Sequence, residues 1–145
     1  MTALDPARGV LSASEERDLS TGRVGTAPPS LEALSKVAEG SFLPNLTSMK
    51  EIRDADVAFL ALHGGQGEDG TIQALLDMAH VKYTGSGHLA SALAMDKDLS
   101  KKLFRAADVK TADWLMIPVT VEQVEGMLGL PVVVKPSKEG STVGL

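Results

Sequence analysis

The chain contains no cysteine, and aromatic residues make up only 3% of its 145 positions. Without cysteine, disulfide bonds, thiolate nucleophiles and cysteine-ligated zinc sites are excluded. The core has to be built from Ala, Leu, Val and Met because aromatic side chains are so scarce. No apolar run reaches the roughly 18 residues that a membrane-spanning helix needs, and residues 1–10 lack the apolar centre of a signal peptide. We therefore expect a cytoplasmic protein without membrane contact.

Charge excludes a further class of partner. The formal net charge is −5, which argues against a general nucleic-acid-binding protein. A hydrophobic share of 43% and a charged share of 23% are ordinary for a globular chain. This length can hold one domain, or pieces of two. Local lysine clusters can still bind a phosphate group.

The stretch that organises the chain runs over residues 57–105. It opens with an apolar run at 57–62, which predicts a strand buried on both faces of a parallel sheet. After a glycine-rich turn at 64–70, apolar residues recur at helical spacing and predict an amphipathic helix: Ile72, Leu75, Leu76 and Ala79. A second helix is expected over 96–107, with Asp96 as its N-cap. This order of strand, turn and helix predicts a βα unit and an α/β fold.

The glycine-rich turn satisfies the dinucleotide pattern G-x-G-x-x-G through Gly65, Gly67 and Gly70. In a dinucleotide site the helix N-terminus faces a pyrophosphate, but Glu68 and Asp69 would repel it and complement the helix dipole themselves. A P-loop is also excluded because no Lys-Ser/Thr pair follows Gly70. Two interpretations remain. One is a tight turn with Asp69 as N-cap; the other is a loop that presents carboxylates and the preceding histidine to a cationic or zwitterionic small molecule.

Three blocks in this stretch carry a resemblance to a known family. They are the block HGGQGEDGTIQ at 63–73, the block YTGSG at 83–87 and the block ASALAMDK at 90–97. Together and in this order they resemble the D-alanine–D-alanine ligases, ATP-grasp enzymes of bacterial cell-wall synthesis. Several blocks in the right order are far more specific than a single glycine pattern.

The resemblance implies a fold in two parts. Residues 1–94 would form a D-alanine-binding, Rossmann-like α/β domain with a parallel sheet, of which 1–47 are poorly defined by sequence. A short helix is predicted there over 30–38. Residues 95–145 would begin an ATP-grasp α+β domain. Since the family fold needs a further stretch of similar length, we expect this chain to be an incomplete front portion, unstable and inactive alone.

The resemblance also implies the chemistry. The expected reaction joins two D-alanines through an acyl phosphate, with ATP and Mg²⁺ as cofactors, D-alanine as the substrate and a homodimer as the assembly. Lys97 stands in the first turn of the second helix, where a cation opposes the helix dipole by about 0.3–1 kcal/mol. A bound anion would offset that cost, and in the family the lysine of this block contacts the ATP phosphates. Lys101 and Arg105 continue the same basic stripe, which is otherwise typical of a solvated helix face.

The last part of the chain supplies further phosphate candidates. Strands are predicted over 111–119 and 131–136, separated by a helix with a capping box at Thr120 that ends at Gly126 or Gly129. By resemblance, Lys135 is the second ATP-binding lysine. The turn that follows it contains small residues, whose backbone N–H groups would cover the phosphates: Gly140, Ser141 and Thr142. The alternative is a hairpin turn with a surface lysine. Ser141 would also belong to the hydrogen-bonded group of the active site.

Two residues are candidates for holding the first D-alanine. Glu16 lies in a Ser-x-Glu-x-x-Leu-Ser block that resembles the family's N-terminal block, whose glutamate binds the substrate ammonium group; the alternative is a solvated helix start. His63 follows the predicted strand, where parallel sheets place ligand contacts. His80 and His88 have no such support and are expected at the surface. No histidine has a metal-site spacing, so no metal ligand is assigned.

Two other functions remain open from sequence. The chain could be a non-catalytic α/β module that binds an amino acid or phosphate. It could also belong to an ATP-grasp ligase with another acceptor, such as D-lactate.

Overall fold

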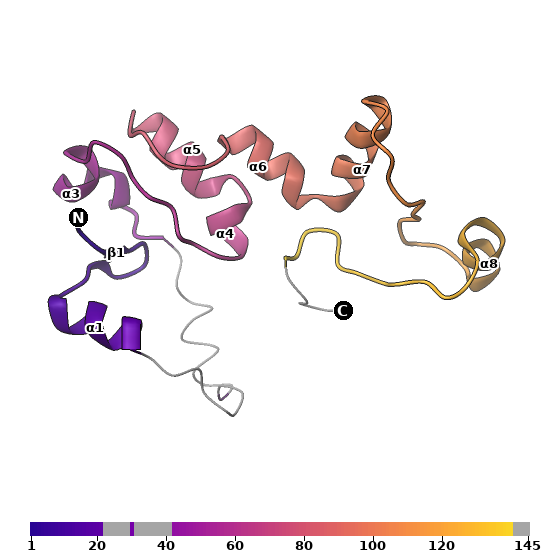
Figure 1. The fold of residues 1–145 in the computed structure, drawn as a ribbon, viewed down its shortest axis with the longest axis horizontal. Helices are drawn as coiled ribbons and strands as arrows, with labels where there is room; N and C mark the ends of the chain where they lie inside the picture. The colour runs from indigo at the N-terminus through magenta and orange to yellow at the C-terminus, as the bar shows by residue number, and fades with distance from the viewer. Residues whose placement is uncertain (22–29, 31–41, 141–145) are drawn as a thin grey trace. The chain divides into compact units, whose positions relative to one another are not determined.

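The computed structural model describes residues 1–21, 30 and 42–140 (Figure 1). The chain divides into two compact units, Met1–Ala58 and Phe59–Leu145, which are described separately. Apart from Ser30, the helix predicted over 30–38 lies outside the described residues. In the part of the chain that is described, no helix is long and apolar enough to cross a bilayer.

The first unit begins with a small hairpin. Strand β1 (Leu4–Asp5) pairs antiparallel with β2 (Gly9–Val10). Asp5 closes the turn between them, because its Oδ1 accepts hydrogen bonds from the backbone amides of Ala7 at 2.8 Å and Arg8 at 3.2 Å. The sequence showed no strand before the first helix. The strands escape detection because each has only two residues, too few for an alternating pattern.

Helix α1 (Ala13–Thr21) follows the hairpin directly. Ser12 and Glu15 form the reciprocal bonds of a capping box: the Ser12 amide donates to Glu15 Oε2 at 2.8 Å, and the Glu15 amide donates to Ser12 Oγ at 3.3 Å. The unit continues with a 3₁₀ turn, η1 (Leu46–Ser48), and a short helix, α3 (Lys50–Arg53). Its buried centre is Leu46, which is 2% exposed.

The second unit is built mainly from consecutive helices, drawn from pink to orange in Figure 1. Their bounds are α4 (Gly65–Glu68), α5 (Thr71–Met78), α6 (His88–Met95) and α7 (Lys97–Ala106), and each packs against the next. Helix α5 confirms the predicted amphipathic helix, because Ile72 and Leu76 on its apolar face are buried together with Val81. Helix α8 (Val121–Leu128) follows further along the chain.

Gly70 makes the close packing of α5 and α6 possible. Its φ is +95°, and a Cβ added there would lie 2.4 Å from the backbone oxygen of His88. Gly70 is also the N-cap of α5, so the expectation that Asp69 is the N-cap was wrong by one residue. Asp69 still contributes to this helix start, because its Oδ1 accepts from the Thr71 amide at 2.9 Å. The left-handed backbone needed at the cap favours glycine over aspartate.

The other two predicted helix starts are confirmed. Asp96 caps α7 by accepting from the amides of Asp98 at 3.0 Å and Leu99 at 3.1 Å. Thr120 and Gln123 form the capping box of α8, which ends at Gly129.

The three strands predicted from residue 57 onward are not formed. Among the described residues the only sheet is the antiparallel β1–β2 pair, so no parallel sheet is seen there, and residues 57–62, 111–119 and 131–136 form no strand. Burial of the first segment on both faces was also wrong, since Val57 is 54% and Phe59 77% exposed. Apolar and β-branched residues favour a strand only when a partner backbone accepts its hydrogen bonds. No strand in the described part of the chain partners these segments. In the first of them the Leu60 amide donates instead to the Thr84 hydroxyl at 3.1 Å.

Candidate functional site

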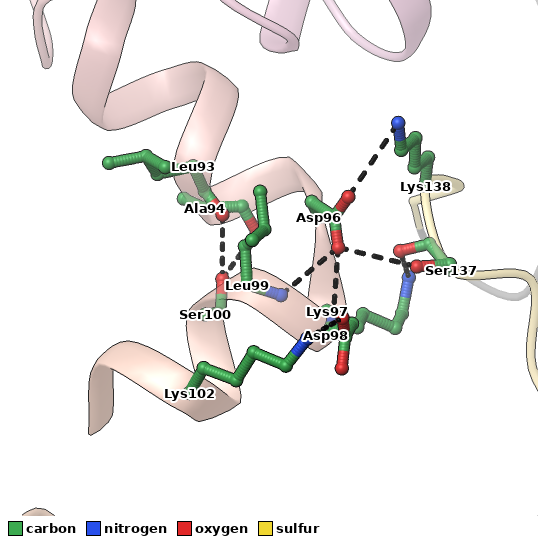
Figure 2. Close-up of polar contacts among 10 residues, drawn as sticks. All are labelled: Leu93, Ala94, Asp96, Lys97, Asp98, Leu99, Ser100, Lys102, Ser137 and Lys138. Atoms are coloured by element: carbon green, nitrogen blue, oxygen red, sulfur yellow. Dashed lines mark hydrogen bonds and ion pairs between the residues drawn. The ribbon is translucent and has the colours of Figure 1, made fainter. Parts of the chain in front are cut away.

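The predicted phosphate-binding lysine is docked on a distant segment of the second unit. Lys97 is the first residue of α7, and its backbone amide donates to the Ser137 carbonyl at 3.0 Å. Its ammonium Nζ donates to the Glu139 carbonyl at 2.5 Å. It also reaches the Ser137 carbonyl at 3.5 Å; Figure 2 shows Lys97 beside Ser137. The two carbonyl dipoles therefore offset the cost of a cation in the first turn of the helix.

Asp96 joins the same two segments. Its Oδ1 caps α7 and also accepts from Ser137 Oγ at 3.4 Å, while its Oδ2 lies 3.6 Å from Lys138 Nζ (Figure 2). The hydrogen bond from the Leu99 amide is the main cause that lowers the pKa of the Asp96 carboxyl below its ordinary value, and the charge of Lys138 and the hydroxyl of Ser137 act in the same direction. The carboxylate is therefore ionised at neutral pH. Sequence reasoning recognised Asp96 only as a cap, since nothing local indicates a partner 41 residues away.

The segment that docks on α7 carries the other phosphate candidates. Lys135 is exposed and lies two residues before Ser137. Gly140 is half-buried, and a Cβ built on it would lie 3.3 Å from Glu68 Oε2. The structure thus brings Lys97 to the segment between Lys135 and Gly140. Ser141 and Thr142 lie outside the described residues.

Glu68 lies between two of the predicted site residues. It ends α4, and its Oε1 is 3.8 Å from Nδ1 of His63, whose side chain is 92% exposed. Its Oε2 is the oxygen that approaches Gly140. The glycine-rich turn therefore pairs with the histidine expected beside the substrate and lies close to the start of the expected phosphate loop. Gln73 of the same block is buried in α5, and its Oε1 has no hydrogen-bond partner within the described residues.

Glu16 lies in the first unit, one residue after the capping Glu15 of α1. Its side chain is exposed. The block around it starts a helix, as the resemblance implies. The pairing of Glu16 with His63 around one D-alanine stays a prediction, because the two residues belong to different units.

The rest of the basic stripe on α7 has a structural role that the sequence did not indicate. Lys101 Nζ lies 5.2 Å and Arg105 Cζ 4.5 Å from the ring centroid of Trp114. The Trp114 indole N–H donates to Asp98 Oδ1 at 2.9 Å, and Lys101 donates to the Ala112 carbonyl at 2.6 Å. These cation–π contacts and hydrogen bonds hold the segment after α7 against the helix. The stripe is therefore not a simple solvated face.

A second polar cluster fixes the YTGSG block to α5. His88 Nδ1 lies 2.7 Å from Asp77 Oδ2, and the Tyr83 hydroxyl donates to Asp77 Oδ1 at 2.9 Å. These hydrogen bonds, first that of His88 and then that of Tyr83, lower the pKa of Asp77. His88 is at the surface, as expected, but it has a carboxylate partner that its spacing in the sequence does not reveal.

The described residues contain no group of three or more histidines and carboxylates that could hold a metal ion. They therefore do not fit a Mg²⁺ site.

Comparisons with known proteins support one family. The family profile described as D-ala D-ala ligase N-terminus matches residues 8–86. The chain is 40% identical over 136 residues to a D-alanine–D-alanine ligase of Paracidovorax citrulli, covering 91% of this chain and 40% of the relative. It is 43% identical over 136 residues to that of Cupriavidus necator, covering 91% of this chain and 41% of the relative. The chain thus spans about 40% of the length of these curated relatives.

Solved structures agree. The crystal structure of a Bacillus anthracis D-alanine–D-alanine ligase matches 78% of this chain and 34% of its own, with 35% identity and a TM-score of 0.54. The same enzyme complexed with ATP matches 61% of this chain and 32% of its own, with 41% identity and a TM-score of 0.54. The VanG D-Ala:D-Ser ligase of Enterococcus faecalis matches 62% of this chain and 28% of its own, with 34% identity and a TM-score of 0.55. These matches are consistent with a piece of an α/β protein.

Proposed function

This chain belongs to the D-alanine–D-alanine ligase family, and we propose that it provides the front part of an ATP-dependent ligase that joins two D-alanines for the cell wall. The observation that carries the proposal is the docking of Lys97 on residues 137–139, which brings the start of α7 to the segment that holds Lys135 and Gly140. The curated relatives that match 91% of the chain are D-alanine–D-alanine ligases. We place the reaction in the cytoplasm and expect a homodimer.

In this proposal the phosphates of ATP bind at the start of α7. Lys97 exchanges a carbonyl partner for a phosphate oxygen, and Lys135 supplies a second cation. Gly140, Ser141 and Thr142 present backbone N–H groups, which need small side chains so that the phosphates can approach. Fixed cations and amides stabilise the charge that moves during phosphoryl transfer. The ATP complex of the Bacillus anthracis enzyme, whose structure this chain resembles, supports ATP as the nucleotide.

The first D-alanine is held by Glu16 through its ammonium group and lies beside His63. Its carboxylate attacks the γ-phosphate of ATP, which forms an acyl phosphate and releases ADP. The amine of the second D-alanine then attacks the acyl carbon and phosphate leaves, with Ser141 in the hydrogen-bonded group around the reacting atoms. Water has to be excluded, because it would hydrolyse the acyl phosphate. Since the described residues do not fit Mg²⁺, we assign it no ligand and derive no step through it.

Nucleotide binding tests the proposal, in a polypeptide with the full length of the curated relatives and this chain as its front part. We expect ATP to bind, and we expect Lys97→Ala to weaken its affinity by about tenfold or more, as lost charge-assisted hydrogen bonds of 1.5–3 kcal/mol would do. Lys102→Ala is the matched control, because Lys102 lies on the same helix and pairs only with Asp98 among the described residues. Equal affinities for the two variants would remove Lys97 from the site. A full-length polypeptide that binds no ATP would refute the proposed function.

Acceptor choice is tested separately, in a polypeptide with the full length of the curated relatives and this chain as its front part. We expect ADP release that depends on D-alanine, and Glu16→Gln should raise the D-alanine requirement without changing ATP affinity. Release with D-serine or D-lactate as the second substrate, but not with D-alanine alone, would assign the chain to a ligase with another acceptor.

A further inference from the structure

Asp96 does more than start a helix. Of its two carboxylate oxygens, Oδ1 accepts from the amides that open α7 and from the hydroxyl of Ser137, and Oδ2 faces the ammonium of Lys138. A helix cap needs only one acceptor oxygen. The remaining contacts of the carboxylate therefore go to the segment 137–139, which is far away in sequence.

That segment in turn fixes both ends of Lys97. The Ser137 carbonyl accepts from the Lys97 backbone amide at 3.0 Å, and the Glu139 carbonyl accepts from its ammonium at 2.5 Å. The first amide of a helix has no acceptor within its own helix, so Ser137 supplies the partner that the helix cannot. Figure 2 shows Asp96 and Lys97 facing Ser137 and Lys138 from the start of α7.

From these contacts we infer that Asp96 is a positioning residue for nucleotide binding. It holds residues 137–139 against the start of α7, and this sets the direction of Lys97 and the approach of Gly140 to the same place. The inference rests on the proposed function, since it takes the phosphates to bind there. Asp96 itself does not contact the nucleotide. A carboxylate would repel phosphate, and here its charge is shared by two helix amides, a hydroxyl and an ammonium.

The variant Asp96→Ser separates the two roles of the side chain. Serine is as good a helix cap as aspartate, so α7 keeps its start. Its single, shorter-reaching oxygen leaves no acceptor for Ser137 and Lys138. Ser137→Ala removes one of the two links from the other side without touching the cap, and leaves the Lys138 ion pair in place. Asp98→Ser is the matched control, because Asp98 lies in the same turn but pairs with Lys102 and Trp114.

The first measurement is amide hydrogen exchange at Lys97 in the chain without nucleotide. Protection of this amide depends on the Ser137 carbonyl, so it reports directly whether residues 137–139 are docked. We expect Asp96→Ser and Ser137→Ala to speed the exchange of Lys97, and Asp98→Ser to leave it unchanged. If Asp96→Ser leaves Lys97 exchange unchanged, Asp96 does not hold the segment and the inference is overturned.

The second measurement is the affinity for ATP, at a temperature where circular dichroism shows every variant folded. If the docked arrangement falls to about a tenth of the population, the apparent Kd rises about tenfold. We expect this rise for Asp96→Ser and Ser137→Ala, no additional rise when they are combined, and no rise for Asp98→Ser. A merely structural role would lower the melting temperature but not this affinity.

The outcomes separate the inference from the proposed function. Wild-type chain that binds ATP together with an Asp96→Ser variant that binds it equally well overturns the inference alone. A full-length wild-type polypeptide that does not bind ATP refutes the proposed function and the nucleotide role of Asp96 with it. The exchange of Lys97 then shows whether the docking of the segment stands as a purely structural contact.

Discussion

Replacing Gly70 by alanine should strongly destabilise the second unit. Gly70 has a φ of +95°, and a Cβ at this position would lie 2.4 Å from the His88 backbone oxygen and 3.3 Å from the Cβ and backbone nitrogen of Ala92. The closest contact is with backbone, which a rotamer change cannot relieve. Helices α5 and α6 would have to move apart at the point where they pack against each other.

Two energetic costs add in the Gly70→Ala variant. The left-handed conformation costs an alanine roughly 1–2 kcal/mol, and overpacking costs about 1–3 kcal/mol. The free energy of unfolding should therefore fall by about 2–5 kcal/mol. The free energy of unfolding of a native domain is only about 5–15 kcal/mol, so this loss is a large share of the stability.

Urea unfolding followed by far-UV circular dichroism and by the fluorescence of Trp114, the only tryptophan, measures this loss. Gly87→Ala is the matched control. Gly87 has a φ of −68°, and the nearest atom to a Cβ there is the Tyr83 hydroxyl oxygen at 3.9 Å. Gly87 is the N-cap of α6, so we expect Gly87→Ala to lower the free energy of unfolding by at most about 1 kcal/mol. Equal midpoints for the two variants would refute the argument that Gly70 sets the approach of α6 to α5.

Three further effects are expected. Gly126→Ala should stabilise the chain by about 0.5–1 kcal/mol, measured as a higher melting temperature, because Gly126 is inside α8 and nothing lies within 4 Å of an added Cβ; a lower melting temperature would contradict this. Thr120→Ala should cost about 1 kcal/mol by removing the cap of α8, seen as a lower urea midpoint, whereas an unchanged midpoint would show that the cap does not contribute. Asp77→Asn should be less stable than wild type at neutral pH, because the pKa of Asp77 is lowered in the folded state. The stability that the ionised Asp77 carboxylate contributes is present above its ordinary pKa of 3.8 and is lost as the pH falls through the folded pKa. The denaturation curves of the two proteins should therefore converge in acid. A difference that grows in acid would exclude this linkage.

Local sequence signals predicted helices α5, α7 and α8 of the second unit well, but not α4, which was expected to be a turn, or α6. The recurrence of Ile72, Leu75 and Leu76 predicts α5, and the cap residues Asp96 and Thr120 predict where α7 and α8 begin. Each of these features depends on residues within one or two turns of each other, so the information is contained in a short stretch. The family was also recognisable from three blocks of the sequence.

Strands were predicted poorly for the opposite reason. Residues 131–136 have the composition of a strand, yet they form none, and Val133 and Val134 are 73% and 79% exposed. A strand is completed by the backbone of another segment, and its composition alone cannot supply that partner. The hairpin at the N-terminus shows the converse, because two residues per strand pair once Asp5 closes the turn.

The sequence by itself determined helices α5, α7 and α8, the caps of α7 and α8, and the family, since these depend on near neighbours and on ordered blocks. Only the tertiary structure decided that Lys97 is held by carbonyls 40 and 42 residues away, that Asp96 serves both α7 and residues 137–138, and that Trp114 covers the rest of the basic stripe. Contacts of this kind depend on how the chain folds back on itself. No spacing in the sequence predicts which distant segments meet, because loops of many different lengths close at a similar cost in entropy.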